Sequence, residues 1–211
     1  MTVDPSKTMI YHITNVGNLP GIIASGGIYS DARMRDAGLA PTEIGFSSIK
    51  ARRLGQYRID CCESRYVGEF VPFYFCPKSP MLYTINRGNT GHPPGCQKDI
   101  VYLVSYAQRA FDLERPWAIS DGNAGAAYTT FANDSGAIGR INWEIVKSNS
   151  WGNDRTRMHT KATELLVADF FPLASFVGIA CQNEIIANEV RAALTARAVG
   201  LEVKVIPQWY F

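Results

Sequence analysis

The sequence predicts an α+β fold in which strands outnumber helices. Segments rich in β-branched and aromatic residues are more numerous than segments with helical spacing. The two kinds do not alternate regularly along the chain, as they do in a doubly wound sheet. No internal repeat, low-complexity tract or long linker divides the 211 residues. We therefore expect residues 1–211 to form a single domain.

A strand followed by a helix is expected near the start of the chain. Residues 9–14 alternate β-branched or aromatic residues with others, which is typical of a strand. Residues 16–25 have one apolar face, with Asn18 as a possible cap and Pro20 in the first turn. Two glycines at 26–27 end this segment. The opening is therefore a strand-turn-helix unit.

The later elements follow from the same patterns. Residues 30–58 are polar and basic and predict a local positive surface. Turns rich in Pro and Gly then separate four strand-like segments, which are residues 69–75, 100–106, 129–131 and 165–168. Residues 147–161, taken alone, are typical of a mobile polar loop. A helix at 183–198 and a strand at 203–206 close the chain.

Charge and cysteine usage exclude several classes of protein. The 21 Lys and Arg against 19 Asp and Glu give a formal net charge of +2, too small for a wholly polybasic binder. The five cysteines have no C-x-x-C spacing, which argues against a disulfide framework or a thiolate zinc site. No apolar run approaches the roughly 20 residues that cross a bilayer, and residues 1–7 do not resemble a signal peptide. We expect a cytoplasmic protein with no membrane contact.

Familiar catalytic motifs are absent from the sequence. It contains no G-x-x-x-x-G-K-[ST] phosphate loop, no G-x-G-x-x-G fingerprint and no G-x-S-x-G elbow. His12, His92 and His159 stand far apart with no H-E-x-x-H pair, so no metal site is expected. A cysteine nucleophile paired with a histidine stays open, because such pairs meet in space, although no cysteine is singled out.

An ordered set of segments resembles one family closely. The set consists of Tyr11-His12-Ile13-Thr14, Asn18-Leu19-Pro20-Gly21-Ile22, Gly26-Gly27-Ile28, the aromatic segment 71–83, Ser120-Asp121-Gly122-Asn123-Ala124, Ile141-Asn142-Trp143 and Thr163-Glu164-Leu165-Leu166-Val167. In this order, from about residue 9 to residue 175, the segments are similar to those of the DarT family of DNA ADP-ribosyltransferase toxins. The order of the whole set is far more specific than any one segment.

The resemblance implies both a fold and an activity. The implied fold is that of ADP-ribosyltransferases of the PARP-like kind, with a split central β-sheet and a cleft that holds NAD. Members of the family transfer ADP-ribose from NAD to a base of single-stranded DNA and release nicotinamide, without a metal. A macrodomain antitoxin, DarG, removes the modification. The implied co-substrate is therefore NAD, and the implied partners are single-stranded DNA and a DarG-type antitoxin.

The resemblance also implies roles for particular residues. Glu164 matches the catalytic glutamate, and His12 matches a histidine that contacts NAD. The pair Arg52-Arg53 matches a segment with a catalytic or NAD-binding arginine. The resemblance does not decide between the two, and we assign the catalytic role to Arg53 and NAD contact to Arg52. The other candidate NAD contacts are Thr14, Asn18, Met81 and Tyr83.

The proposed chemistry needs side chains of these kinds. Cleavage between ribose and nicotinamide develops positive charge on the sugar, which the carboxylate of Glu164 can stabilise. An arginine such as Arg53 can hold a pyrophosphate through two parallel hydrogen bonds. His12 can hydrogen-bond the ribose hydroxyls, and Tyr83 or Tyr74 can stack on the nicotinamide ring.

The stretch 147–161 has the composition of a single-strand binding surface. Four basic residues against one acidic residue give it a charge of +3, and tryptophans lie in and near it. Phosphates take the charge in such a surface while splayed bases stack on aromatic rings. The candidate DNA contacts are Lys147, Trp151, Arg155, Arg157 and Lys161.

Other functions stay open at this point. One is an NAD-dependent transferase that modifies RNA or protein, and another is a non-catalytic nucleic-acid-binding domain with the same fold. A nuclease is disfavoured because no carboxylate cluster for paired metals stands out. The sequence also leaves open whether the acceptor base is thymine or guanine.

Overall fold

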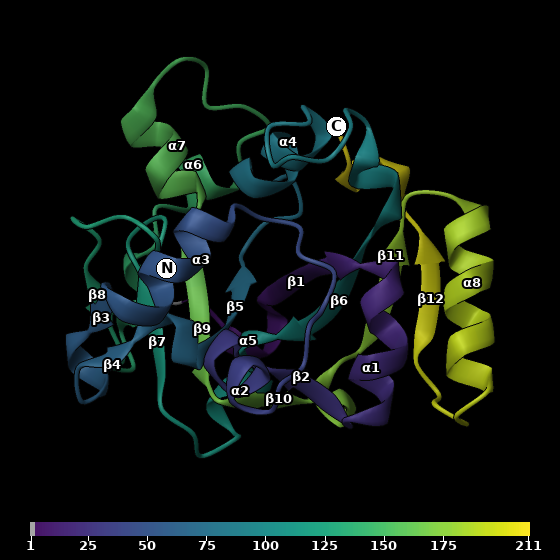
Figure 1. The fold of residues 1–211 in the computed structure, drawn as a ribbon. Helices are drawn as coiled ribbons and strands as arrows, with labels where there is room; N and C mark the ends of the chain where they lie inside the picture. The colour runs from purple at the N-terminus through teal and green to yellow at the C-terminus, as the bar shows by residue number, and fades with distance from the viewer. Residues whose placement is uncertain (1–2) are drawn as a thin grey trace.

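The fold is built on an eight-stranded sheet, shown in Figure 1. The structure is a computed structural model and describes residues 3–211. Across the sheet the strands lie in the order β12 (Glu202–Val205), β11 (Gly178–Cys181), β6 (Ile100–Tyr106), β1 (Met9–Asn15), β5 (Phe70–Tyr74), β9 (Glu164–Ala168), β7 (Trp117–Ser120) and β8 (Phe131–Ala132). Two smaller sheets pair β2 (Gly27–Tyr29) with β10 (Phe170–Pro172) and β3 (Arg58–Ile59) with β4 (Arg65–Tyr66).

Short helices surround the sheet. They are α1 (Leu19–Ala24), α2 (Asp31–Asp36), α3 (Ser47–Gly55), α4 (Pro80–Asn86), α5 (Ala107–Phe111), α6 (Trp143–Lys147), α7 (Arg155–Lys161) and α8 (Glu184–Thr195). Helix α8 is amphipathic and covers β11 and β12 at one end of the sheet, while α6 and α7 lie at the other end (Figure 1). The α+β prediction is confirmed by this arrangement.

The sheet is divided in its middle, between β1 and β5. Strand β1 pairs with β6 from Met9–Tyr106 to Asn15–Ile100, but it meets β5 only at Tyr11–Tyr74. Strand β5 pairs with β9 along its whole length, from Phe70–Ala168 to Tyr74–Glu164. The two halves therefore diverge beyond one shared pair, and the predicted split central sheet is confirmed. The gap in pairing places the end of β5 and the start of β9 beside β1.

Both faces of the central strands are buried. Along β1, Ile10 packs into one apolar cluster with Phe73 and Leu165, while Tyr11 packs into another with Tyr102. Alternate residues of a strand point to opposite faces, so a strand covered on both sides reads as a nearly continuous apolar run. This burial fixes the positions of the strand ends that carry the candidate site residues.

Several elements agree closely with the sequence-based predictions. The strand expected at 100–106 has those bounds, and the strand at 9–14 extends by one residue. Helix α8 begins after Asn183, whose side chain accepts a hydrogen bond from the backbone N–H of Ile186 at 3.0 Å. These segments were predictable because long, strongly patterned elements leave little choice of conformation.

Three segments differ from the predictions. The first is the strand expected at 129–131, since β8 covers only Phe131–Ala132. Residues 16–18 form a single 3-10 turn before α1, and Asn18 does not cap that helix, because its side chain binds the backbone of Thr42 instead. The stretch 147–161 is not simply a loop, since its second half is α7. Asp154 caps α7 by accepting from the backbone N–H groups of Thr156 and Arg157 at 2.8 and 3.0 Å.

Three further properties concern the described residues. Within residues 3–211, no helix combines the length and apolarity needed to span a membrane. The five cysteines all fall in this range and are free thiols. The same residues contain no cluster of three or more His, Cys, Asp or Glu side chains arranged to hold a metal ion.

Candidate functional site

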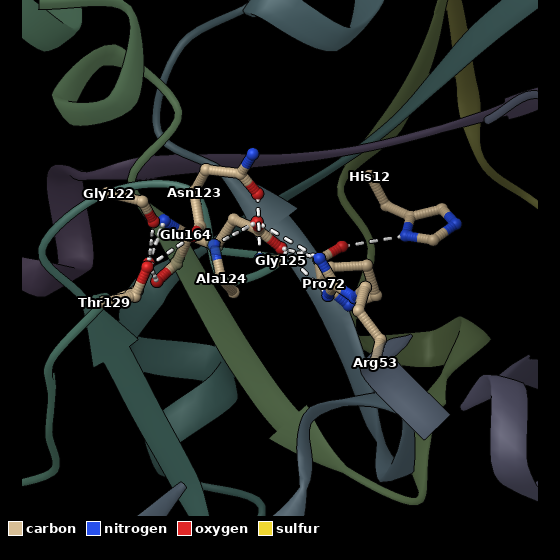
Figure 2. A network of polar contacts seen from close by, with 10 residues as sticks. His12, Arg53, Pro72, Gly122, Asn123, Ala124, Gly125, Thr129 and Glu164 are labelled. Carbon is tan, nitrogen blue, oxygen red and sulfur yellow. Dashed lines mark hydrogen bonds and ion pairs between the residues drawn. The ribbon is translucent and has the colours of Figure 1, made fainter. Parts of the chain in front are cut away.

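Glu164 is the first residue of β9 and lies beside the gap in the sheet. It is paired across the strands with Tyr74, and its backbone N–H donates to the Ser120 hydroxyl at 2.9 Å. The residue is only 1% exposed, yet its Oε1 accepts from the backbone N–H of Ala124 at 3.1 Å (Figure 2). A buried carboxylate is costly without such partners. The surroundings therefore hold this carboxylate in one orientation.

Arg53 of α3 supplies the opposite charge. Its Nη1 donates to both carboxylate oxygens of Glu164 at 3.2 and 3.1 Å, and its Nη2 donates to Oε2 at 3.1 Å. The two side chains are 13% and 2% exposed. Burial alone would lower the pKa of Arg53, but the charge of Glu164 and its hydrogen bonds outweigh burial and raise it. The result is a desolvated, two-point ion pair.

The loop after β7 aims a backbone donor at this carboxylate. The Asn123 side chain accepts from the backbone N–H of Gly125 at 2.9 Å, and its backbone carbonyl accepts from the Thr129 hydroxyl at 2.6 Å. These bonds shape a tight turn that presents the N–H of Ala124 to Glu164 (Figure 2). Sequence reasoning gave Ala124 no role, because a backbone donor leaves no signature in the side chain.

His12 lies on β1, across the gap from Glu164. Its Nδ1 is 2.9 Å from the backbone carbonyl of Pro72 in β5, and in Figure 2 Pro72 lies between the imidazole and the Arg53–Glu164 pair. A carbonyl only accepts, so Nδ1 carries the hydrogen and Nε2 of the neutral ring is an acceptor. Burial lowers the pKa of His12, although the Pro72 bond opposes this. The ring is therefore neutral at pH 7.

The lowered pKa of His12 predicts a loss of stability in acid. Below about pH 6.5 the unfolded chain binds a proton at this position and the folded chain does not, so the free energy of unfolding falls by up to about 1.4 kcal/mol per pH unit. Replacing His12 by Gln is expected to flatten this dependence between pH 7.5 and 5.5, as measured by urea unfolding. His159, whose pKa burial also lowers, contributes equally in both proteins. Identical pH slopes for the two proteins would contradict the assignment.

Asn18 ties the segment before α3 to β1. Its Nδ2 donates to the Thr14 hydroxyl at 3.0 Å and to the Thr42 carbonyl at 2.9 Å, and its Oδ1 accepts from the Thr42 N–H at 2.7 Å. Thr14 is buried. Met81 of α4 lies against Gly45 of the same segment. Three candidate NAD contacts, Thr14, Asn18 and Met81, therefore all adjoin the segment 42–45, either directly or through one another.

Two cavities flank this region. One, of about 400 Å³, is lined by Thr42, Glu43, Gly45–Ser48 and Asn89–His92. The other, of about 460 Å³, shares Thr42, Glu43 and His92 with it and extends to residues 93–96 and 98–100. Glu164 and Arg53 line neither cavity. The Arg53–Glu164 ion pair thus lies outside both cavities. A buried pair of titratable side chains indicates a functional site better than cavity volume does.

The side chains of Tyr83 and Arg52 contact residues other than Arg53 and Glu164. The Tyr83 ring, 38% exposed, meets the rings of Trp151 and Phe211 edge-on, each at 5.2 Å between centroids. Tyr83 is thus grouped with Trp151, a candidate DNA contact. Arg52 is exposed, and its guanidinium carbon lies 5.9 Å from the centre of the Tyr57 ring. Of the two neighbouring arginines, only Arg53 contacts Glu164.

The candidate DNA contacts divide into exposed and buried groups. Lys147 and Arg155 are exposed, and Arg157 is partly exposed. Lys161 is only 1% exposed, and its Nζ donates to the backbone carbonyls of Val146 and Ser148 at 2.9 and 2.5 Å. The prediction that Lys161 contacts DNA is wrong. Its ammonium group turns inward because the carbonyls at the end of α6 have no helical partner.

Lys161 is therefore expected to matter for stability. Replacing it by Met leaves the carbonyls of Val146 and Ser148 without their donor, and each unsatisfied buried group costs about 1–3 kcal/mol. We expect the free energy of unfolding to fall by about 3 kcal/mol, as measured by urea titration. The matched control is Lys147→Met, on the exposed surface of α6. Equal stabilities for the two variants would contradict this role.

Comparisons with known proteins show which family this chain is similar to. Residues 11–211 match the family described as ssDNA thymidine ADP-ribosyltransferase, DarT. A DNA ADP-ribosyl transferase of Thermus aquaticus is 32% identical over 98% of this chain and 90% of the relative, and one of Mycobacterium tuberculosis is 29% identical over 90% and 83%.

Solved structures show the same similarity in three dimensions. Thermus sp. 2.9 DarT in complex with ADP-ribosylated ssDNA has a TM-score of 0.90 at 28% identity, covering 100% of this chain and 99% of that chain. The same protein in complex with NAD+ has a TM-score of 0.86 at 28% identity, with both chains fully covered. The similarity therefore includes both halves of the split sheet.

Proposed function

This chain belongs to the DarT family, and from that premise we propose that Glu164 and Arg53 form the centre at which it transfers ADP-ribose from NAD to single-stranded DNA. The chain is an NAD-dependent DNA ADP-ribosyltransferase, as its family membership and its likeness to the Thermus complexes indicate. We further propose thymine as the acceptor base, because the family description names thymidine. The buried Arg53–Glu164 pair is the observation that supports the assignment of the centre.

Glu164 has the properties that the reaction requires of a carboxylate. As the bond between ribose C1′ and nicotinamide breaks, the bond electrons leave with nicotinamide and positive charge develops on the sugar. A carboxylate already held by Ala124 and Arg53 needs no reorganisation to stabilise that charge. When a base nitrogen attacks C1′, the same carboxylate can accept the proton that the nitrogen loses.

Arg53 has two roles in this proposal. Its Nη1 and Nη2 atoms engage the carboxylate from the end of the guanidinium fork and so orient Glu164. A guanidinium carries five N–H donors, so the side that bears Nε can still bind the pyrophosphate of NAD. The arginine would then connect the anionic part of the co-substrate with the catalytic carboxylate.

The positions of the remaining candidate NAD contacts, most of them in or next to β1 and α4, support their proposed roles. Nε2 of His12 is an acceptor suited to a ribose hydroxyl, since Nδ1 is bound to Pro72. Thr14, Asn18 and Met81 support or line the same region, while Arg52 and Tyr83 would contact NAD only at its periphery.

The function is tested by the mass of an oligonucleotide. Incubation of the protein with NAD and a thymidine-containing single strand, without magnesium, is expected to add one ADP-ribose to the strand and release one nicotinamide. Unchanged masses across a panel of all four bases in varied contexts would exclude DNA as the acceptor. Consumption of NAD with RNA or protein in place of DNA would then favour the alternative transferase.

We also propose that the exposed residues of α6 and α7 bind the strand. Lys147, Arg155 and Arg157 supply positive charge. Trp151, in the segment between the two helices, supplies an aromatic ring that meets the ring of Tyr83. Each phosphate neutralised by a basic side chain contributes a slope of about −0.7 to the dependence of log K on log salt for a single strand.

Charge reversal tests this surface. The double variant Arg155→Glu, Arg157→Glu is expected to bind a single strand at least tenfold more weakly, and to reduce the salt slope by about 1.4. The matched control reverses Arg191 and Arg197, exposed residues at α8 and just after it, and changes the net charge equally. If both double variants had the same salt slope, the strand would lie elsewhere.

We also propose a domain organisation for the chain and a partner that reverses the modification. Residues 1–211 act as one domain, which is supported by a sheet that contains strands from both ends of the chain. A macrodomain hydrolase of the DarG type reverses the modification, as the resemblance to the family implies. Its addition to a modified oligonucleotide should return the original mass.

A further inference from the structure

Tyr128 is the most exposed aromatic residue among the large hydrophobic side chains that reach the surface. Its relative exposure is 71%, against 38% for Tyr83 and 36% for Phe211. It lies on the loop between β7 and β8, four residues after Ala124, whose N–H binds Glu164. Four residues span at most about 14 Å. The loop therefore places an exposed aromatic ring close to the reacting centre.

The loop that carries Tyr128 is closed by hydrogen bonds at its base. The Asp121 carboxylate accepts from the N–H of Thr130 at 3.0 Å and from its hydroxyl at 2.6 Å. The Thr129 hydroxyl donates to the Asn123 carbonyl at 2.6 Å. These bonds fix the backbone on both sides of Tyr128, so little conformational freedom would be lost when a ligand binds.

One face of the Tyr128 ring is supported by His159 of α7. The ring centroids are 4.6 Å apart and the planes are inclined by 43°. The imidazole is 11% exposed and lies against Gly122, where an added Cβ would come within 2.1 Å of Nε2. Burial lowers the pKa of His159, although Asp121 opposes this, so the ring is neutral at pH 7. The opposite face of Tyr128 is left open to solvent.

A positive charge lies on the side of α7 that carries His159, the support of this ring. Arg155 precedes His159 by four residues in α7, so the two side chains occupy the same side of the helix. Arg155 is exposed. The two acidic groups nearby in the fold are already engaged, since Asp121 accepts two hydrogen bonds from Thr130 and Asp154 caps α7. An open aromatic face beside a guanidinium is the combination that binds a base together with its phosphate. A protein partner would need a broader apolar surface.

We propose that Tyr128, supported by His159, is the platform on which a base next to the target base stacks, so that it helps to determine the sequence context of modification. This inference rests on the proposed function, because it assumes that single-stranded DNA reaches Glu164. Tyr128 is then a specificity-determining residue. His159 is a positioning residue that acts through Tyr128.

The test measures DNA binding without NAD, so that no transfer occurs. Tyr128→Ala is expected to bind a fluorescent thymidine-containing oligonucleotide about tenfold more weakly, since stacking of one base contributes about 1–3 kcal/mol. Tyr128→Phe and Tyr128→Trp keep an aromatic face and should bind within about twofold of the original protein. The control is Ile185→Ala, a residue 81% exposed on α8 at the other end of the sheet (Figure 1).

An abasic scan separates stacking from a general structural effect. One abasic site is moved along the oligonucleotide, and at one position beside the target base it should weaken binding to the original protein but not to Tyr128→Ala. Unchanged binding by Tyr128→Ala would overturn the inference, as would losses that are equal in both proteins at every position. The proposed function fails only if the original protein modifies no single strand, so the two failures are distinguishable.

Discussion

Glu164→Gln is expected to lower the turnover of ADP-ribose transfer by about 10³-fold, the upper range for loss of one preorganised electrostatic or proton-accepting group. The substitution removes the negative charge that faces the developing positive charge on the sugar. It keeps the shape of the side chain and one amide oxygen that can accept from Ala124 or Arg53. Single-turnover rates at saturating NAD and oligonucleotide measure the effect.

The same substitution separates catalysis from folding. Glu164→Ala would leave the buried Arg53 charge unpaired, and breaking a buried ion pair costs about 3–5 kcal/mol. The glutamine variant should therefore be more stable than the alanine variant in urea, while it still binds NAD in calorimetry. Full turnover by a folded Glu164→Gln protein would remove Glu164 from the mechanism.

Arg53→Lys is expected to lower kcat/KM by about 10²-fold although the positive charge is kept. A lysine ammonium is a point charge and cannot bind both oxygens of Glu164 in the plane of a fork. The carboxylate would lose its fixed orientation, and a misplaced catalytic group of this kind costs about 10²-fold. The measurement is the initial rate of nicotinamide release at several oligonucleotide concentrations.

The matched control for this experiment is Arg197→Lys, a change at an exposed residue just after α8. It makes the same chemical substitution without altering the Arg53–Glu164 pair. A result in which both lysine variants have kcat/KM within threefold of the original protein would show that the fork geometry of Arg53 has no catalytic role.

The elements that the sequence predicted well are those whose hydrophobic pattern is compatible with few conformations. The strand at 100–106 is buried at nearly every position, and such a run flanked by turn residues fits a central strand. Helix α7 was missed because it is short and polar, so neither length nor periodicity distinguishes it from a loop. Only Asp154, a good cap, signalled its start.

The sequence names the side chains of the candidate site but does not indicate their contacts. Glu164 and Arg53 were both named, yet nothing in the chain indicates that residues 111 positions apart form a two-point ion pair. Lys161 and Arg155 are alike as basic residues of one polar stretch, and only the packing of α6 against α7 buries one and exposes the other. Burial of a charge is decided by tertiary partners, which local composition does not specify.

A crystal structure of this protein with a non-hydrolysable NAD analogue tests the central claim most directly. We expect the nicotinamide ribose to lie against the Glu164 carboxylate, with a guanidinium donor of Arg53 within about 3 Å of a pyrophosphate oxygen. An analogue bound only in the cavities lined by Thr42 and His92, with the Arg53–Glu164 pair unchanged and remote from the sugar, would contradict the account.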